Sequence, residues 1–89
     1  MADNDFLAAL QKITSGGVSL QELIAAAQAA SNAGQPDQAR QLYQVWIAMN
    51  AENPLVFIAH FNCSTLQTQL GDAAGAEASL RAALARNPD

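Results

Sequence analysis

Several residue types are scarce in this chain of 89 residues, and each scarcity excludes a class of protein. Cys63 is the one cysteine, which excludes a fold held together by disulfides. Four Lys and Arg residues stand against eight Asp and Glu residues, and this balance argues against a nucleic-acid-binding face. The apolar runs are only a few residues long, whereas a membrane-spanning helix needs roughly 20. We therefore expect neither nucleic acid nor a membrane among the partners.

The remaining composition predicts a small folded domain. Hydrophobic residues make up 51% of the chain and charged residues 13%, which is too apolar for a disordered segment. The first six residues carry Asp3 and Asp5 and no basic cluster, so they do not resemble a secretory signal. Together with the lone thiol, this predicts a reducing, cytoplasmic location.

Alanine and glutamine dominate the chain, and both favour helices. Glycine and proline divide the sequence into five segments with helical spacing of apolar residues: 3–14, 19–33, 36–49, 53–70 and 72–86. No segment alternates as a strand would, so the predicted fold is all-α. The connections are two to five residues long, which predicts that consecutive helices pack as antiparallel neighbours.

The starts of these segments carry recognisable signals. Ser19 and Glu22 have the spacing of a capping box, in which each side chain satisfies a free backbone N–H. Pro36 suits the first turn of the next helix. Asn53 followed by Pro54 predicts a cap and a first-turn proline for the fourth segment, and Asn87-Pro88 is expected to close the fifth.

The core needs large side chains, because alanine-rich helices approach closely but bury little apolar area each. The clearest stripe of apolar residues lies in segment 36–49 and includes Tyr43 and Trp46. The aromatic side chains expected to anchor the core are Phe6, Tyr43, Trp46, Phe57 and Phe61.

The sequence is also similar to itself. Gly34 and Gly71 lie 37 residues apart, and each is followed five residues later by an alanine and nine residues later by a large side chain (Ala39 and Tyr43, Ala76 and Leu80). Asn-Pro follows each second helix, at 53–54 and 87–88. This pattern resembles the tetratricopeptide repeat (TPR), whose period is 34 residues.

The TPR resemblance implies antiparallel helix pairs stacked as a short right-handed solenoid of about five helices. Residues 1–89 then form one domain, with an N-terminal helix and loop (1–18), a degenerate repeat (20–53) and a second repeat (57–89). The chain departs from the family in three places: Trp46 stands where a small residue is typical, Cys63-Ser64 where Leu-Gly is usual, and Gln67 where an aromatic is usual.

In TPR arrays the first helix of each repeat lines a concave groove that binds a partner. The resemblance places in it Gln21, Ile24, Gln28 and Ser31, and then Ile58, Phe61, Asn62, Thr65 and Gln69. This face is mostly polar and uncharged, which suits an extended peptide or a partner helix. The alternative is that these residues are simply solvated.

A narrower resemblance concerns residues 41–46, 53–55, 61–62 and 71–77, which look like the amino-terminal repeats of bacterial SPINDLY-type O-linked N-acetylglucosamine transferases. In that family the repeats present protein substrates, and asparagines inside the superhelix hold the substrate backbone. Asn62 lies where such an asparagine would be expected. The catalytic domain of such enzymes is several times longer than this chain, so the resemblance implies a substrate-presenting N-terminal fragment.

Chemistry-bearing residues are few. His60 and Cys63 lie three residues apart on one predicted helix, but two ligands are too few for a zinc site. A Cys-His nucleophile pair also needs an orienting third group and an oxyanion site. We expect both residues to pack against the paired helix, and we predict no enzyme, no metal and no cofactor.

The last segment suggests a further role. Leu80 and Leu84 have no predicted cover, and the chain stops at Asp89, where another repeat would begin. Either the chain is part of a longer array or this face pairs with a second copy in a homodimer. The favoured interpretation is a non-catalytic protein–protein interaction module. The SPINDLY-like fragment and a self-associating oligomerisation domain are the alternatives.

Overall fold

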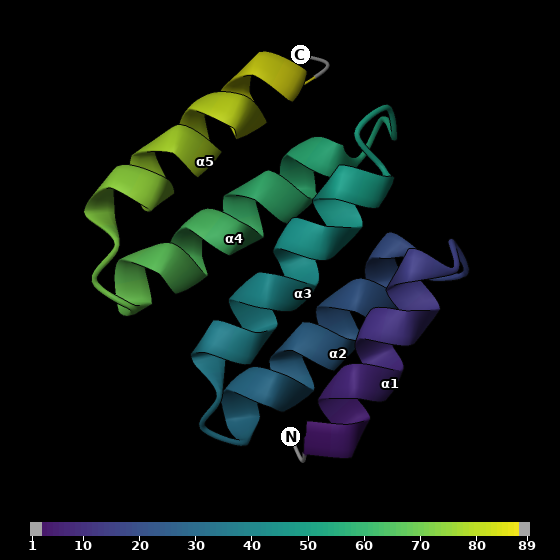
Figure 1. Cartoon of the computed structure of the whole chain (residues 1–89). Coiled ribbons are helices and arrows are strands. Elements are labelled where there is room, and N and C mark those ends of the chain that lie inside the picture. Colours follow the sequence, from purple (N-terminus) through teal and green to yellow (C-terminus); the bar gives the residue numbers. More distant parts are fainter. Residues whose placement is uncertain (1–2, 88–89) are drawn as a thin grey trace.

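In a computed structural model of the chain, residues 3–87 are described, and they form five α-helices without a strand. The helices are α1 (Asp3–Thr14), α2 (Leu20–Asn32), α3 (Pro36–Met49), α4 (Val56–Gln69) and α5 (Ala73–Arg86). Figure 1 shows that successive helices run in alternately opposite directions, with α1 and α5 at opposite ends of the molecule. The all-α prediction with about five helices is confirmed.

Most helix boundaries follow the local signals. Ser19 Oγ accepts a hydrogen bond from the Glu22 N–H, and the Glu22 carboxylate accepts one from the Ser19 N–H, so the capping box is formed. These hydrogen bonds, first from the backbone and then from the side chain of Ser19, lower the pKa of Glu22. Pro36 occupies the first turn of α3 as predicted.

The fourth helix begins later than the sequence predicts. Asn53 and Pro54 precede α4, which starts at Val56. The Asn53 side-chain oxygen accepts a hydrogen bond from the Leu55 N–H at 2.8 Å, so Asn53 closes a turn and does not cap the helix. Such Asx turns compete with helix capping because they use the same side-chain oxygen. At the other end, Asn87 is the C-cap of α5, and Pro88 lies outside the described residues.

The helices α2 and α4 end in the same way. Gly34 and Gly71 have φ angles of 78° and 80°, the left-handed region that favours glycine. The next residue in each turn, Gln35 or Asp72, donates its N–H to a carbonyl five residues earlier, at 2.9 and 2.8 Å. The turn after α1 has the same form, because Gly16 has a φ of 84° and the Gly17 N–H donates to the Lys12 carbonyl at 3.3 Å.

Helix α3 occupies the centre of the fold, because it packs against α1, α2 and α4. Its Trp46 is only 1% exposed, and its Nε1–H donates to the backbone oxygen of Val18 at 2.8 Å. Asn50 Nδ2 in turn donates to the Trp46 carbonyl at 2.9 Å. One side chain thus joins α3 to the loop between α1 and α2.

Two expectations about packing are wrong. Helix α1 packs mainly on α3 and not on its neighbour in sequence, α2. Among the expected anchors, Tyr43 and Trp46 are buried and Phe6 and Phe57 are partly buried, but Phe61 is 56% exposed. The helical spacing of Phe61 puts it on the side of α4 that neither α3 nor α5 covers.

Small and polar side chains bring α4 and α5 together. Ala76 and Ala83 are buried, and Ser79 Oγ donates to the buried Gln67 Oε1 at 2.5 Å. At Gly75 an added Cβ would clash with the Asp72 carboxylate and come within 2.8 Å of Gln67 Nε2. An alanine at position 75 would therefore crowd both the Asp72 carboxylate and the Gln67 amide.

We predict that Trp46→Phe destabilises the fold by about 1–3 kcal/mol, because the Val18 carbonyl loses its donor and the smaller ring leaves a gap. Urea unfolding followed by circular dichroism measures the change. Met49→Ala on the same helix is the control, since Met49 is 49% exposed and its loss should shift stability by less than about 0.5 kcal/mol. Equal midpoints for the two variants would contradict the role given to the indole.

We also expect Gly75→Ala to lower stability by about 1 kcal/mol, although alanine favours helices, because an added Cβ displaces the Asp72 carboxylate that caps α5 and loss of a cap costs about 0.5–2 kcal/mol. Thermal unfolding compares it with Gly17→Ala, where the nearest atom to an added Cβ is Ser15 Oγ at 3.9 Å. The control should be neutral or slightly stabilising. A Gly75→Ala variant more stable than the parent chain would show that the cap survives an added methyl group.

Candidate functional site

A groove of about 350 Å³ lies between α2 and α4. Helix α3 packs against both of these helices, while the backbones of α2 and α4 make little contact with each other, and the space between them stays open. The groove is lined from α2 by Ile24, Ala27, Gln28 and Ser31, from α3 by Tyr43, and from α4 by Asn62, Thr65, Leu66 and Gln69.

The lining side chains are brought together by helical spacing. Ile24, Gln28 and Ser31 are separated by four and three residues, so they share one face of α2. Asn62, Thr65 and Gln69 share one face of α4 for the same reason, with intervals of three and four. Two rows of mainly polar side chains therefore face one another across the groove.

No charged residue lines this groove, and its polar groups are amides and hydroxyls. Asn62 Nδ2 donates to the Tyr43 hydroxyl at 3.3 Å, which orients the Asn62 amide against α3. The Tyr43 hydroxyl is protonated at neutral pH, as in any tyrosine, and burial raises its pKa further. Because that oxygen accepts from Asn62, its own O–H is available as a donor to a bound group.

The structure brings some of the predicted site residues together and separates others. Ile24, Gln28, Ser31, Asn62, Thr65 and Gln69 all line the groove. Gln21 is exposed near the start of α2 and does not line it. Ile58 and Phe61 line a different hollow, between α4 and α5.

Tyr43, Ala27 and Leu66 also line the groove, although they are not among the predicted site residues. The sequence predicts a packing role for Tyr43, and its ring is buried. The available signal was its hydroxyl, since a buried tyrosine usually directs its polar end to a hydrogen-bond partner.

The second hollow measures about 430 Å³ and is almost wholly apolar. It is lined by Phe57, Ile58, Phe61, Leu80, Ala83, Leu84 and Asn87. Three of these side chains are well exposed: Phe61 at 56%, Leu80 at 40% and Leu84 at 75%. The two hollows therefore differ in chemistry, since the first offers amides and hydroxyls for hydrogen bonds and the second mainly apolar surface.

His60 and Cys63 lie on the side of α4 that faces α5. Cys63 is 2% exposed, and burial raises the pKa of its thiol, with a smaller opposing effect from the Ser79 hydroxyl. Burial and the charge of Arg86 lower the pKa of His60. Among residues 3–87, no cluster of three or more metal-ligating side chains is present.

Comparisons with known protein families, curated proteins and solved structures find no match to this chain. Within the described part of the chain, every helix is too short or too polar to cross a membrane.

We predict that Cys63 is protected from thiol reagents in the folded chain. Its reaction with a disulfide reagent at pH 8 should be at least about 100-fold slower than in concentrated urea, because the buried thiol must be exposed and ionised first. Equal labelling rates in the two conditions would show that the thiol is open to solvent.

The raised pKa of Cys63 also makes the free energy of unfolding depend on pH. The contribution of the buried thiol to stability is fully present below the ordinary thiol pKa and decreases as the pH rises above it.

Proposed function

We propose that this chain is a non-catalytic protein–protein interaction module of the TPR type, which binds an extended peptide in the groove between α2 and α4. The observation that carries this proposal is the uncharged lining of the groove, in which amides and hydroxyls from two helices face each other across about 350 Å³. The proposed module acts in a reducing, cytoplasmic compartment, which suits its unpaired, buried thiol.

The chemistry of the groove favours an extended segment over a helix. An extended peptide carries backbone N–H and C=O groups that need partners, whereas a helix satisfies these groups internally. Amides such as Gln28, Asn62 and Gln69 offer a donor and an acceptor at once, so each can pair with a peptide unit. Since Lys and Arg are absent from the lining, the preferred segment is an internal, neutral one and not a terminal carboxylate.

A glycine turn followed five residues later by a buried alanine occurs twice and supports the TPR assignment. Gly34 and Gly71 adopt the same conformation 37 residues apart, and Ala39 and Ala76 are buried at equivalent positions after them. In this proposal α2 and α3 form one helix pair, α4 and α5 form the next, and α1 precedes them.

A second candidate function is favoured by the position of Asn62. Its amide lines the groove and is oriented by Tyr43, as suits a residue that holds a substrate backbone. In that case the chain is a substrate-presenting segment of a SPINDLY-like bacterial glycosyltransferase, and its ligand is the protein substrate of that enzyme.

Peptide display against the full chain tests the binding proposal. Peptides selected on the parent chain should bind Thr65→Arg at least tenfold more weakly, a difference of about 1.4 kcal/mol, because the long charged side chain enters the groove. Thr65 is exposed, so the substitution leaves the core untouched. Affinity measured by isothermal titration provides the comparison.

Gln21→Arg is the matched control, because Gln21 is exposed on α2 but lies outside the groove. It adds the same side chain and should leave affinity unchanged. If the selected peptides bind both arginine variants as well as they bind the parent chain, the groove is not the binding site.

A further inference from the structure

Helices α4 and α5 present an apolar face beside the groove. Phe61, Leu80 and Leu84 are all exposed on it, and Leu84 is the most exposed large hydrophobic side chain in the described part of the chain, at 75%. Contiguous exposed apolar surface of this kind marks an interaction site. The distribution of its residues along α5 indicates which partner fits.

On this face the exposed Leu84 and a hollow beside Ala76 lie at equal distances from Leu80 along α5. Leu80 lines both the 430 Å³ hollow and a second hollow of about 320 Å³ further toward the start of α5. The second hollow is bordered by small residues, among them Ala73 and Ala76. Leu84 lies four residues after Leu80, and Ala76 lies four residues before it. An antiparallel α5 centred on Leu80 would therefore set each Leu84 opposite an Ala76.

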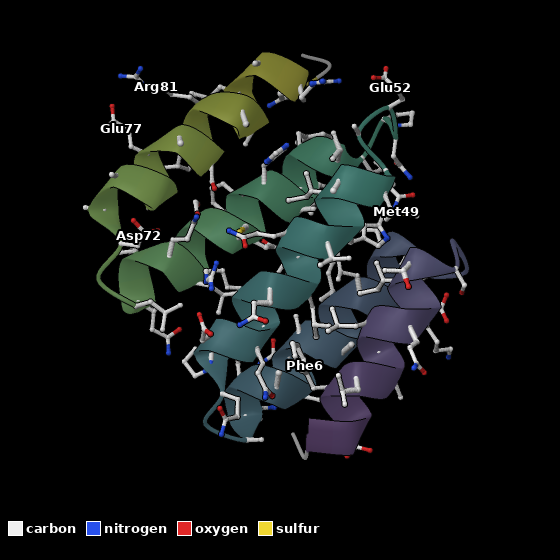
Figure 2. All side chains as sticks on the ribbon, viewed as in Figure 1. Phe6, Met49, Glu52, Asp72, Glu77 and Arg81 are labelled. Carbon is white, nitrogen blue, oxygen red and sulfur yellow. The ribbon has the colours of Figure 1, made fainter. Side chains whose placement is uncertain are left out.

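The charges on α5 are arranged with the same symmetry. Arg81 and Glu77 form an exposed ion pair at 2.6 Å, with side chains 78% and 65% exposed. Figure 2 shows both on the outer side of α5, away from α4. About a two-fold axis at Leu80, Arg81 of one copy lies about 3 Å along the helix from Glu77 of the other, given a rise of about 1.5 Å per residue. Each acid thus meets a base across the axis.

We propose that this face binds the same face of a second copy of the chain, with the two α5 helices antiparallel around a two-fold axis at Leu80. Ala73, Glu77, Leu80 and Leu84 are spaced by four, three and four residues, the spacing of a helix–helix seam. A two-fold interface requires one surface to complement itself in shape and in charge. This surface does so on both counts. Phe61 lies beside the groove residues Asn62 and Thr65 on α4, so the proposed dimer interface adjoins the groove.

Sedimentation velocity of the full chain over a concentration series tests the proposal. The parent chain should be a dimer at micromolar concentration. Leu84→Glu should raise the dissociation constant at least about 100-fold, because each dimer loses two buried leucines. Circular dichroism confirms that the variant is folded. Leu7→Glu is the control, since Leu7 is 57% exposed on α1 and its loss should leave the dimer intact. A parent chain that stays monomeric throughout the series would overturn the proposal.

Charge reversal tests the predicted geometry independently of the apolar contact. Glu77→Arg and Arg81→Glu should each weaken dimerisation, because each places like charges across the axis. An equal mixture of the two variants should form a heterodimer, and the attraction should weaken in high salt. A dimer that is equally stable in each single variant and in the mixture would refute the antiparallel α5 pairing.

Discussion

Burial of the Trp46 indole is the constraint on which the rest of the fold depends. Trp46 belongs to α3 and its ring is almost fully buried. Its N–H needs an acceptor, because an unpaired buried donor costs free energy. The Val18 carbonyl supplies that acceptor and fixes the loop between α1 and α2. With α1, α2 and α4 all packed on α3, the spacing between α2 and α4 is set by α3, and so is the groove between them.

The two surfaces of the molecule follow from the composition of α4. This helix contacts α3 on one side and α5 on another, so the remaining edges are left to solvent or to partners. The open side of α4 carries Asn62 and Gln69 toward α2 and Phe57 and Phe61 toward α5. A helix with apolar residues around most of its circumference lacks a single hydrophobic stripe, and this arrangement suits an element with neighbours on several sides.

Local rules predicted much of the structure, because the responsible interactions lie within a few residues of each other. The capping box at Ser19, the proline of α3 and the glycine turns are of this kind. The failures concern choices that depend on distant residues. The Asn53 side-chain oxygen can either cap a helix or close a turn, and it closes a turn. Helix α1 can pack on α2 or on α3, and Phe61 can lie on a covered or an open side of α4. Ile58 and Phe61 share the open side of α4 with the groove residues but lie nearer to α5, so they line the second hollow.

The hydrogen bond between Ser79 and Gln67 helps to select a single alignment of α4 and α5. Surfaces made of alanine are nearly smooth, so two such helices can slide past each other by one turn with little change in apolar burial. The buried amide of Gln67 removes this freedom, because every shifted alignment would strand it without the Ser79 hydroxyl. A polar pair of modest strength thus selects one alignment of α4 and α5 among several that apolar contact alone would leave close in energy.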